Sequence, residues 1–259
     1  MSSVALAYAS ETTRAPQVGF SERVAQLLDR IDCRLIENDD EREAVFRLRY
    51  DAYLREGAIA PNLSQTFSDG YDDSENCWLF GLYLDGALAS SIRIHVGTED
   101  APVFPSLSVF ADLLEPELLA GRIIIDPTRF VTDQKLSKLH PGLPHVTLRL
   151  CWLAAEYFSA QHFIVAVRAE HQAFYKRTFS HRSICGPRPY PLLSKPITLM
   201  TVNYAEVADQ VHRRYPFFRS SFFERRMMFE RYLPLPRIPL QARPPLNVTG
   251  RAHAVAQAG

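Results

Sequence analysis

An aspartate and an arginine, Asp126 and Arg129, stand three residues apart in the otherwise apolar segment G-R-I-I-I-D-P-T-R-F-V-T-D, which spans 121–133. This segment predicts a buried central strand, and Pro127 within it cannot donate a hydrogen bond to a neighbouring strand. In a regular strand, side chains three apart point to opposite faces, but one bulged residue returns them to the same face. We therefore expect Pro127 to open the sheet and the acid and base to lie side by side there, where a substrate would bind.

Four more charged residues are candidates for the same site. Arg49 falls between aromatic residues of a predicted helix, where a guanidinium needs a carboxylate or carbonyl partner. Asp69 and Asp72 belong to a turn that closes the long loop 57–75, and long loops are often lids or binding loops. Arg93 lies in the second strand of a predicted hairpin. Each also has a plain structural explanation, since aspartates favour turns and strand arginines extend their charged ends to solvent.

The elements that must position these residues alternate between strands and helices. Apolar periodicity predicts helices at 20–31, 38–54, 146–160 and 169–179, a short helical piece at 109–114, and strands at 33–36, 78–84, 87–96, 163–167 and 197–204 beside the central one. Asp85-Gly86 is a strong signal for a two-residue hairpin turn. This order predicts the α/β class, with a mixed central sheet flanked by helices in a single domain.

The ends of the chain differ from this domain. We expect a flexible N-terminus at 1–19, the α/β domain at 20–204, a helical appendix at 205–231 and a disordered Pro-rich tail at 232–259. The segments follow one another without any internal repeat. The chain is therefore interpreted as one domain with an appendix and two tails.

Composition narrows the class of protein. The formal net charge is zero, which gives no global field for nucleic acid, and the hydrophobic content of 47% is that of a globular domain. Cys33, Cys77, Cys151 and Cys185 share no metal or redox spacing and are expected to be free thiols in a reducing compartment. With neither a signal-peptide pattern nor an apolar run of about 20 residues, we expect a cytoplasmic protein.

The charged residues resemble, in order and spacing, those of the acyl-homoserine lactone (autoinducer) synthases. The matching positions are R-x-x-x-Y (Arg49, Tyr53), D-x-x-D (Asp69, Asp72), the hairpin arginine (Arg93) and acid-x-x-R-F (Asp126, Arg129, Phe130). In that family the corresponding residues form a connected charged network at the mouth of the active site. The sequence departs from the family at Asp126, which stands for Glu, and at Ile59, which falls about where the family has Trp.

Residues 146–204 are more similar to a neighbouring group, the long-chain N-acyl amino acid synthases of FeeM type. The strings R-L-R-Y-D-A-Y-L, R-A-E-H-Q-A-F-Y-K-R and R-P-Y-P-L-L, at 47–54, 168–177 and 188–193, carry that resemblance. Both groups are branches of the GNAT acyltransferase superfamily, whose fourth strand is splayed. The resemblance covers about 33–231 and implies transfer of a long-chain acyl group from an acyl carrier protein thioester to the amine of an amino acid.

The resemblance also implies the donor. The G-x-G-type pyrophosphate loop of coenzyme A-using GNAT enzymes is missing before Val146, which fits a donor presented by a carrier protein. The acyl-phosphopantetheine of that carrier is then a substrate, and no tightly bound cofactor or metal is expected. Acyl carrier proteins are acidic, so a basic docking patch is expected, with Lys176, Arg177 and Arg182 as candidates.

Catalytic roles follow from the resemblance, with alternatives. Asp126 is either the base that takes a proton from the amine or an acid that orients an arginine, because paired carboxylates are poor bases. Tyr175 either protonates the leaving thiolate or is a packed helix aromatic. Arg49, Arg93 and Arg129 either bind the acceptor's carboxylate or form a buried ion network that holds the loop.

Three further expectations complete the site. Backbone N–H groups between 129 and 131, freed by the bulge, would hold the thioester oxyanion. Phe130, Trp152 and Leu148 would line the acyl pocket. The basic, aromatic segment 212–231 would dock the carrier protein, contact a membrane surface, or pack its phenylalanines against the domain, and we favour the packing.

Two alternative functions stay open at this stage. One is an acyl-homoserine lactone synthase that uses S-adenosylmethionine as the acceptor. The other is a GNAT-shaped module that binds acyl carrier protein or an acyl lipid without turnover, because a fold alone does not prove chemistry.

Overall fold

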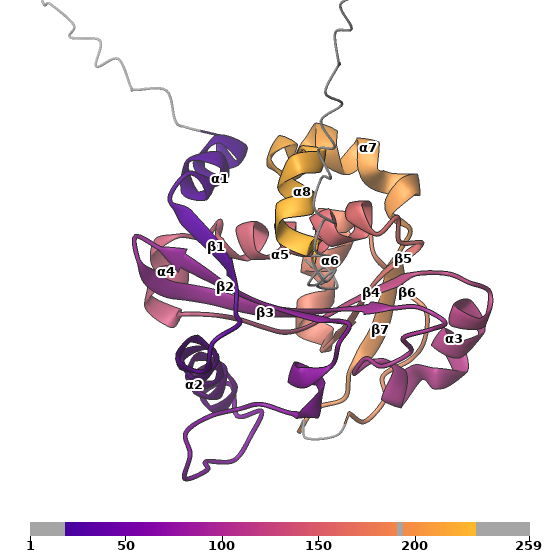
Figure 1. Cartoon of the computed structure of the whole chain (residues 1–259), viewed down its shortest axis with the longest axis horizontal. Coiled ribbons are helices and arrows are strands. Elements are labelled where there is room, and N and C mark those ends of the chain that lie inside the picture. Colours follow the sequence, from indigo (N-terminus) through magenta and orange to yellow (C-terminus); the bar gives the residue numbers. More distant parts are fainter. Residues whose placement is uncertain (1–18, 191–193, 232–259) are drawn as a thin grey trace, which may run out of the picture. The chain divides into compact units, whose positions relative to one another are not determined.

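Seven strands form one mixed sheet in the computed structural model, which describes residues 19–190 and 194–231 (Figure 1). The strands are β1 (Ile31–Leu35), β2 (Cys77–Leu84), β3 (Ala87–Gly97), β4 (Ile124–Thr132), β5 (His162–Val167), β6 (Arg182–Ser183) and β7 (Thr198–Val202). Their order across the sheet is β1-β2-β3-β4-β5-β7-β6. Only β4 and β5 pair in parallel, and all other neighbours are antiparallel. The predicted mixed α/β fold is confirmed.

Helices cover both faces of this sheet. They are α1 (Phe20–Leu28), α2 (Asp39–Arg55), α3 (Leu107–Leu119), α4 (Gln134–Leu139), α5 (Leu143–Tyr157), α6 (Ala169–Phe179), α7 (Tyr204–Arg214) and α8 (Phe222–Phe229), with short 3-10 turns η1 (Gly70–Asp73) and η2 (Pro216–Phe218). Figure 1 shows α1, α5, α7 and α8 on one side of the sheet and α2 and α3 on the other. The main core lies under α5, and separate clusters lie under α2 and α3.

Local sequence signals account for most element positions. The Asp85-Gly86 turn joins β2 and β3 with φ angles of 50° and 86°, as a two-residue hairpin requires. Helix α6 has the predicted bounds. Helix α3 spans Leu107–Leu119 and so extends beyond the predicted 109–114. Pro116 lies inside it, although a proline usually ends a helix.

The sheet opens between β4 and β5. These strands pair only at Ile124 with His162 and Ile125 with Phe163, and they diverge just before Pro127. The prediction of an opening at Pro127 is confirmed.

A bulge marks the other edge of β4. Ser91 of β3 opposes Val131 and Arg93 opposes Thr128, so one residue of β3 faces two residues of β4 there. Arg129, one of the two β4 residues in this bulge, has a φ of 54°. The bulge expected between Asp126 and Arg129 is therefore displaced along the strand: β4 pairs regularly with β3 through Thr128, and the bulge lies at Arg129 and Phe130. There it turns the backbone of β4 at the opening.

The C-terminal helices pack on the main core. Phe217, Phe218 and Phe229 are buried, which confirms the favoured packing of this segment, whereas Phe222 and Phe223 are exposed. None of the described helices is both long and apolar enough to cross a membrane. The four cysteines are free thiols, as expected. The predictions for 1–18 and for the tail from 232 lie outside the described residues.

Candidate active site

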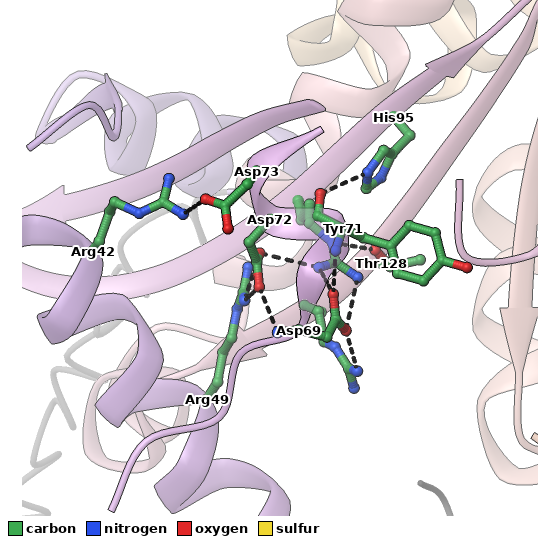
Figure 2. A network of polar contacts seen from close by, with 10 residues as sticks. Arg42, Arg49, Asp69, Tyr71, Asp72, Asp73, His95 and Thr128 are labelled. Atoms are coloured by element: carbon green, nitrogen blue, oxygen red, sulfur yellow. Dashed lines mark hydrogen bonds and ion pairs between the residues drawn. The ribbon is translucent and has the colours of Figure 1, made fainter. Parts of the chain in front are cut away.

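Five charged residues from four segments form one contact network at the bulge, seen closely in Figure 2. We call this set (Arg49, Asp69, Asp72, Arg93 and Arg129) the arginine–aspartate network. Arg49 Nη1 donates to the two carboxylate oxygens of Asp72 at 2.8 and 3.0 Å. Arg93 Nη1 donates to Asp69 at 2.5 Å and lies 3.1 Å from Asp72, and Arg129 Nη2 donates to Asp69 at 2.6 Å. The structure thus contains a connected network of the kind that the resemblance implies, made of five of the six expected charged residues, without Asp126.

The turn that supplies both carboxylates is itself held by them. Asp69 caps η1 by accepting a hydrogen bond from the backbone N–H of Tyr71 at 3.0 Å. Asp72 accepts in return from the backbone N–H of Asp69 at 3.1 Å, which completes a capping box. The D-x-x-D spacing therefore serves two purposes, since it closes the loop and aims both carboxylates at the arginines.

The network carries an excess of positive charge, with three guanidinium groups against two carboxylates. Burial alone would raise the pKa of Asp69, but the hydrogen bonds and charges of Arg93 and Arg129 hold that pKa well below its usual value. Asp69 is therefore ionised at neutral pH, and it is a poor base. What the network can do chemically is attract an anion such as a carboxylate.

Arg129 is held in an unusual position. Its φ of 54° lies in the left-handed region, which costs a residue with a side chain on the order of 1–3 kcal/mol. Its guanidinium carbon lies 4.2 Å from the ring centre of Phe67 and 5.4 Å from that of Tyr53. Its buried Nε has no hydrogen-bond partner among the described residues. The surroundings thus fix a strained arginine that retains donor capacity.

A cavity of about 410 Å³ fills the opening between β4 and β5. Residues 127–132 of β4 form one wall and Ala166 and Val167 of β5 form the other. Arg129, Phe130 and Tyr175 line it, and of the three residues proposed for the acyl pocket Phe130 alone does so. Further lining side chains come from α2, α6 and the loop before β7, and include Tyr53, Arg55, Glu56, Arg168, His171, Phe174, Tyr190 and Lys195.

Asp126 is the clearest correction to the sequence interpretation. It lies beside Ser106 rather than Arg129, accepting hydrogen bonds from the Ser106 backbone N–H at 3.0 Å and from Ser106 Oγ at 2.8 Å. It is fully buried and does not line the cavity. Because the bulge directs Arg129 toward Asp69, Asp126 and Arg129 have different partners instead of each other. Burial raises the pKa of Asp126 to about 6, although the hydrogen bonds from Ser106 oppose that rise.

Trp152 is the second correction. It is fully buried in the main core, stacked on Phe179 at 5.4 Å, and its Nε1 donates to Nε2 of His212 at 2.9 Å. Neither Trp152 nor Leu148 lines the cavity. Helix α5 is apolar around most of its circumference, so its sequence could not show which side faces the cavity.

Tyr175 and the basic residues of α6 stand on different surfaces. Tyr175 is buried and lines the cavity, and burial raises the pKa of its phenol. Lys176, Arg177 and Arg182 are exposed. Arg214 of α7 donates to the carbonyl of Arg177 at 3.2 Å, so a further exposed basic residue lies beside Arg177.

Sequence reasoning missed three residues that shape the site. Ser106 holds Asp126, Thr128 accepts from Arg93 Nε at 3.0 Å, and Tyr190 lines the cavity. Tyr190 stood in the string R-P-Y-P-L-L, but a tyrosine in a Pro-rich turn has no periodic signal. Within 19–190 and 194–231, no group of three His, Cys, Asp or Glu side chains lies close enough to ligate a metal ion.

Solved structures of other proteins share the fold of this chain. The structure of FeeM, an N-acyl amino acid synthase from uncultured soil microbes, matches with a TM-score of 0.60 and 19% identity, over 73% of this chain and 98% of that one. At that identity the likeness shows the fold. An acyl-CoA N-acyltransferase from Pseudomonas aeruginosa (TM-score 0.46, 18% identity, 66% of this chain and 97% of that one) also matches. So does the CoA-dependent acyl-homoserine lactone synthase MesI (TM-score 0.48, 20% identity, 74% of this chain and 97% of that one).

Sequence comparison gives the family. No curated protein sequence matches the chain significantly. The family model for N-acyl amino acid synthase FeeM matches residues 44–203, more than half of the chain. That match includes the whole arginine–aspartate network and every strand that borders the cavity. The chain therefore belongs to the FeeM family of N-acyl amino acid synthases, acyltransferases with a GNAT-like fold.

Proposed function

We propose that this acyltransferase moves a long-chain acyl group from the thioester of an acyl carrier protein to the amine of an amino acid. The observation that carries the proposal is Arg129, a strained and preorganised guanidinium that belongs to a network with excess positive charge and also lines the cavity. A free amino acid brings a carboxylate next to its amine. Binding that carboxylate at Arg129 would hold the amine within the opening between β4 and β5.

The reaction forms one bond and breaks one. The neutral amine nitrogen attacks the thioester carbon, the amide C–N bond forms, and the C–S bond breaks to release a thiol. The amine loses one proton and the thiolate gains one, so the sum is an N-acyl amino acid and free phosphopantetheine thiol. Asp69 is too acidic to take the amine's proton, and Asp126 does not reach the cavity, so neither is assigned as the base.

Tyr175 is the proposed donor to the leaving thiolate. Its phenol stays protonated at neutral pH because burial raises its pKa, and a proton donor must hold its proton until the thiolate forms. Backbone N–H groups of β4 at the opening, where the ladder to β5 has ended, are the proposed hydrogen-bond donors to the thioester oxyanion. The phosphopantetheine arm would thus lie between the diverging strands.

The donor's two ends match two surfaces of the molecule. The acyl chain would occupy the apolar part of the cavity beside Phe130 and Phe174, where each buried methylene contributes about 0.8 kcal/mol. The carrier protein, which is acidic, would dock on the exposed basic surface of Lys176, Arg177 and Arg182. Helix α6 links the two, since Phe174 and Tyr175 line the cavity directly before Lys176.

The test is a product assay with purified full-length protein. Palmitoyl-acyl carrier protein is incubated with the twenty amino acids, or with S-adenosylmethionine, and products are identified by mass spectrometry. We expect an N-palmitoyl amino acid from the first mixture and no lactone from the second. Lactone without an acyl amino acid would reject the proposed acceptor.

Palmitoyl-coenzyme A is the matched control for the donor. It carries the same thioester without the carrier protein, and we expect a lower kcat/KM with it. Substituting Lys176→Glu with Arg177→Glu should lower kcat/KM for the carrier-bound donor and leave the value for palmitoyl-coenzyme A unchanged. Equal losses with both donors would contradict docking at this surface.

A further inference from the structure

Helix α8 has an apolar face that the rest of the described chain leaves uncovered. Three large apolar side chains of this eight-residue helix are exposed: Phe222 at 66%, Phe223 at 70% and Met227 at 61%. Phe229 of the same helix is 2% exposed, packed against Phe80 and Phe158. The helix therefore has an inner face that joins the core and an outer one that does not.

Helical geometry collects the exposed side chains on one arc. At 100° per residue, Phe222, Phe223, Met227 and the exposed Arg226 fall within about 140° of one another. We call these four residues the α8 outer face. Exposed apolar clusters on a protein surface mark sites that contact another protein, a ligand or a membrane. A helix that is apolar on both its inner and its outer side therefore indicates a second binding surface on the outer side.

The charges around this face select the kind of environment. Between His212 and Arg231 the sequence holds six arginines and two glutamates. One of those glutamates, Glu224, is turned inward and pairs with Arg149 at 2.5 and 2.9 Å. Arg219, three residues before the helix, and Arg226, on the outer face itself, are exposed. Aromatic side chains flanked by arginines suit an anionic lipid surface, where rings enter the headgroup layer and guanidinium groups meet phosphates.

None of the four residues of the α8 outer face lines the cavity. Figure 1 shows α8 on the side of the sheet that also carries α1 and α7, whereas α2, which forms part of the cavity wall, lies on the other side. An acyl carrier protein must deliver its thioester to the cavity. A surface on α8 leaves that wall of the cavity free.

We propose that the α8 outer face attaches the protein peripherally to anionic membranes, with Phe222, Phe223 and Met227 entering the headgroup layer. This inference does not depend on the acyl acceptor or donor. It predicts binding that needs both the apolar side chains and the surrounding arginines. A single short helix gives weak, reversible and salt-sensitive attachment rather than insertion.

Vesicle co-sedimentation of the full-length protein tests it. We expect at least tenfold more protein bound to vesicles of phosphatidylcholine with 30% phosphatidylglycerol than to phosphatidylcholine alone at low salt, an order of magnitude set by charge attraction. The triple variant Phe222→Ser, Phe223→Ser, Met227→Ser should lose about tenfold in binding. Arg219→Gln with Arg226→Gln should reduce both binding and its sensitivity to salt.

The matched control removes three equally exposed apolar side chains elsewhere. Leu63, Leu119 and Leu139 are 106%, 74% and 71% exposed, and changing all three to serine should leave vesicle binding unchanged. Equal loss in this control, or no preference for anionic vesicles, would overturn the proposal. So would a dimer in sedimentation velocity that the α8 triple variant abolishes without any vesicle binding, since a second copy would then cover this face.

Discussion

Two groups of carboxylates lie near the opening of the sheet, and they differ in their partners and in the direction of their pKa shifts. Asp69 and Asp72 are surrounded by arginines, and the pKa of Asp69 is held low. Asp126, on the strand itself, has one neutral partner in Ser106, and burial raises its pKa to about 6. Asp126 is only three residues from Arg129 in the sequence, yet Asp69, sixty residues away, is the acid that pairs with Arg129. The partner that the fold provides therefore decides which acid joins the charged site.

Breaking the network at its deepest pair should have the largest effect. Arg49→Met leaves the carboxylate of Asp72 buried with one guanidinium fewer, and losing one member of a buried ion pair costs about 3 kcal/mol of unfolding free energy. Urea denaturation measures this loss. Arg47→Met on the same helix removes an exposed pair with Glu43 and should change stability by less than about 1 kcal/mol. Equal losses would show that the buried pair contributes no more than the exposed one.

Arg129→Ala should mainly damage catalysis. It removes a charge-assisted contact to the acceptor, and we expect kcat/KM to fall about 100-fold, most of it through KM for the amino acid. Steady-state kinetics with palmitoyl-acyl carrier protein gives this number. Arg122→Ala, which removes an exposed arginine just before β4, is the control and should stay near wild type. A loss below threefold in Arg129→Ala would assign this residue to structure alone.

His95, a buried histidine beside the arginine–aspartate network, makes the stability of the folded protein depend on pH. It is fully buried, contacts the carbonyl of Tyr71 at 3.0 Å, and burial with the charge of Arg93 lowers its pKa to about 4. As pH falls from about 6.5 to 4, His95 is therefore protonated in the unfolded chain but stays neutral in the folded protein. The unfolding free energy accordingly decreases as pH falls over this range. We expect about 2 kcal/mol to be lost from this group between pH 7 and 5.

His95→Gln isolates that contribution. Glutamine keeps a donor for the Tyr71 carbonyl and does not titrate, so the difference in unfolding free energy between pH 7 and pH 5 should shrink by about 2 kcal/mol. His171→Gln, an exposed histidine at the cavity rim, is the control and should leave the difference unchanged. An unaltered difference in His95→Gln would mean that His95 titrates alike in both states.

Asp126→Asn should have the smallest effect on activity. Because Asp126 does not line the cavity, we expect kcat/KM within about threefold of wild type, whereas a lost general base costs about 100-fold or more. Because the pKa of Asp126 is raised in the folded protein, its contribution to the unfolding free energy falls as pH rises from about 4 to 6. Asp126→Asn lacks this fall, so its unfolding free energy should rise more steeply with pH over that range than that of the wild type. A 100-fold loss of activity would restore Asp126 as the base.

Much of the fold was predictable because its signals are local. The Asp85-Gly86 turn, the apolar run of β5 and the periodicity of α6 each depend on a few neighbouring residues. The opening of the sheet was also predictable, since Pro127 lacks the N–H that a ladder needs. In the site, the resemblance to the acyl-homoserine lactone synthases indicated which charged residues, far apart in the chain, would come together, and five of those six do.

The rest could not be predicted because it depends on which of several buried surfaces a side chain meets. Ser106 stands 20 residues before Asp126 in a connection without a regular pattern, so nothing linked the two. Trp152 lies on a helix that is apolar on most sides, and only the packed structure shows that it faces α7. The direction of Arg129 follows from its backbone conformation, which no pattern of residue types reveals.

The contact between Trp152 and His212 bears on how this enzyme can be cut down for experiments. A fragment ending at the predicted domain boundary, after Tyr204, would lose His212 and with it the partner of the indole N–H. It would also uncover Trp78, whose ring lies 6.4 Å from that of Phe229. A minimal expression fragment should therefore extend through Phe229. The fluorescence of these two tryptophans offers a direct readout of whether the last helices have docked.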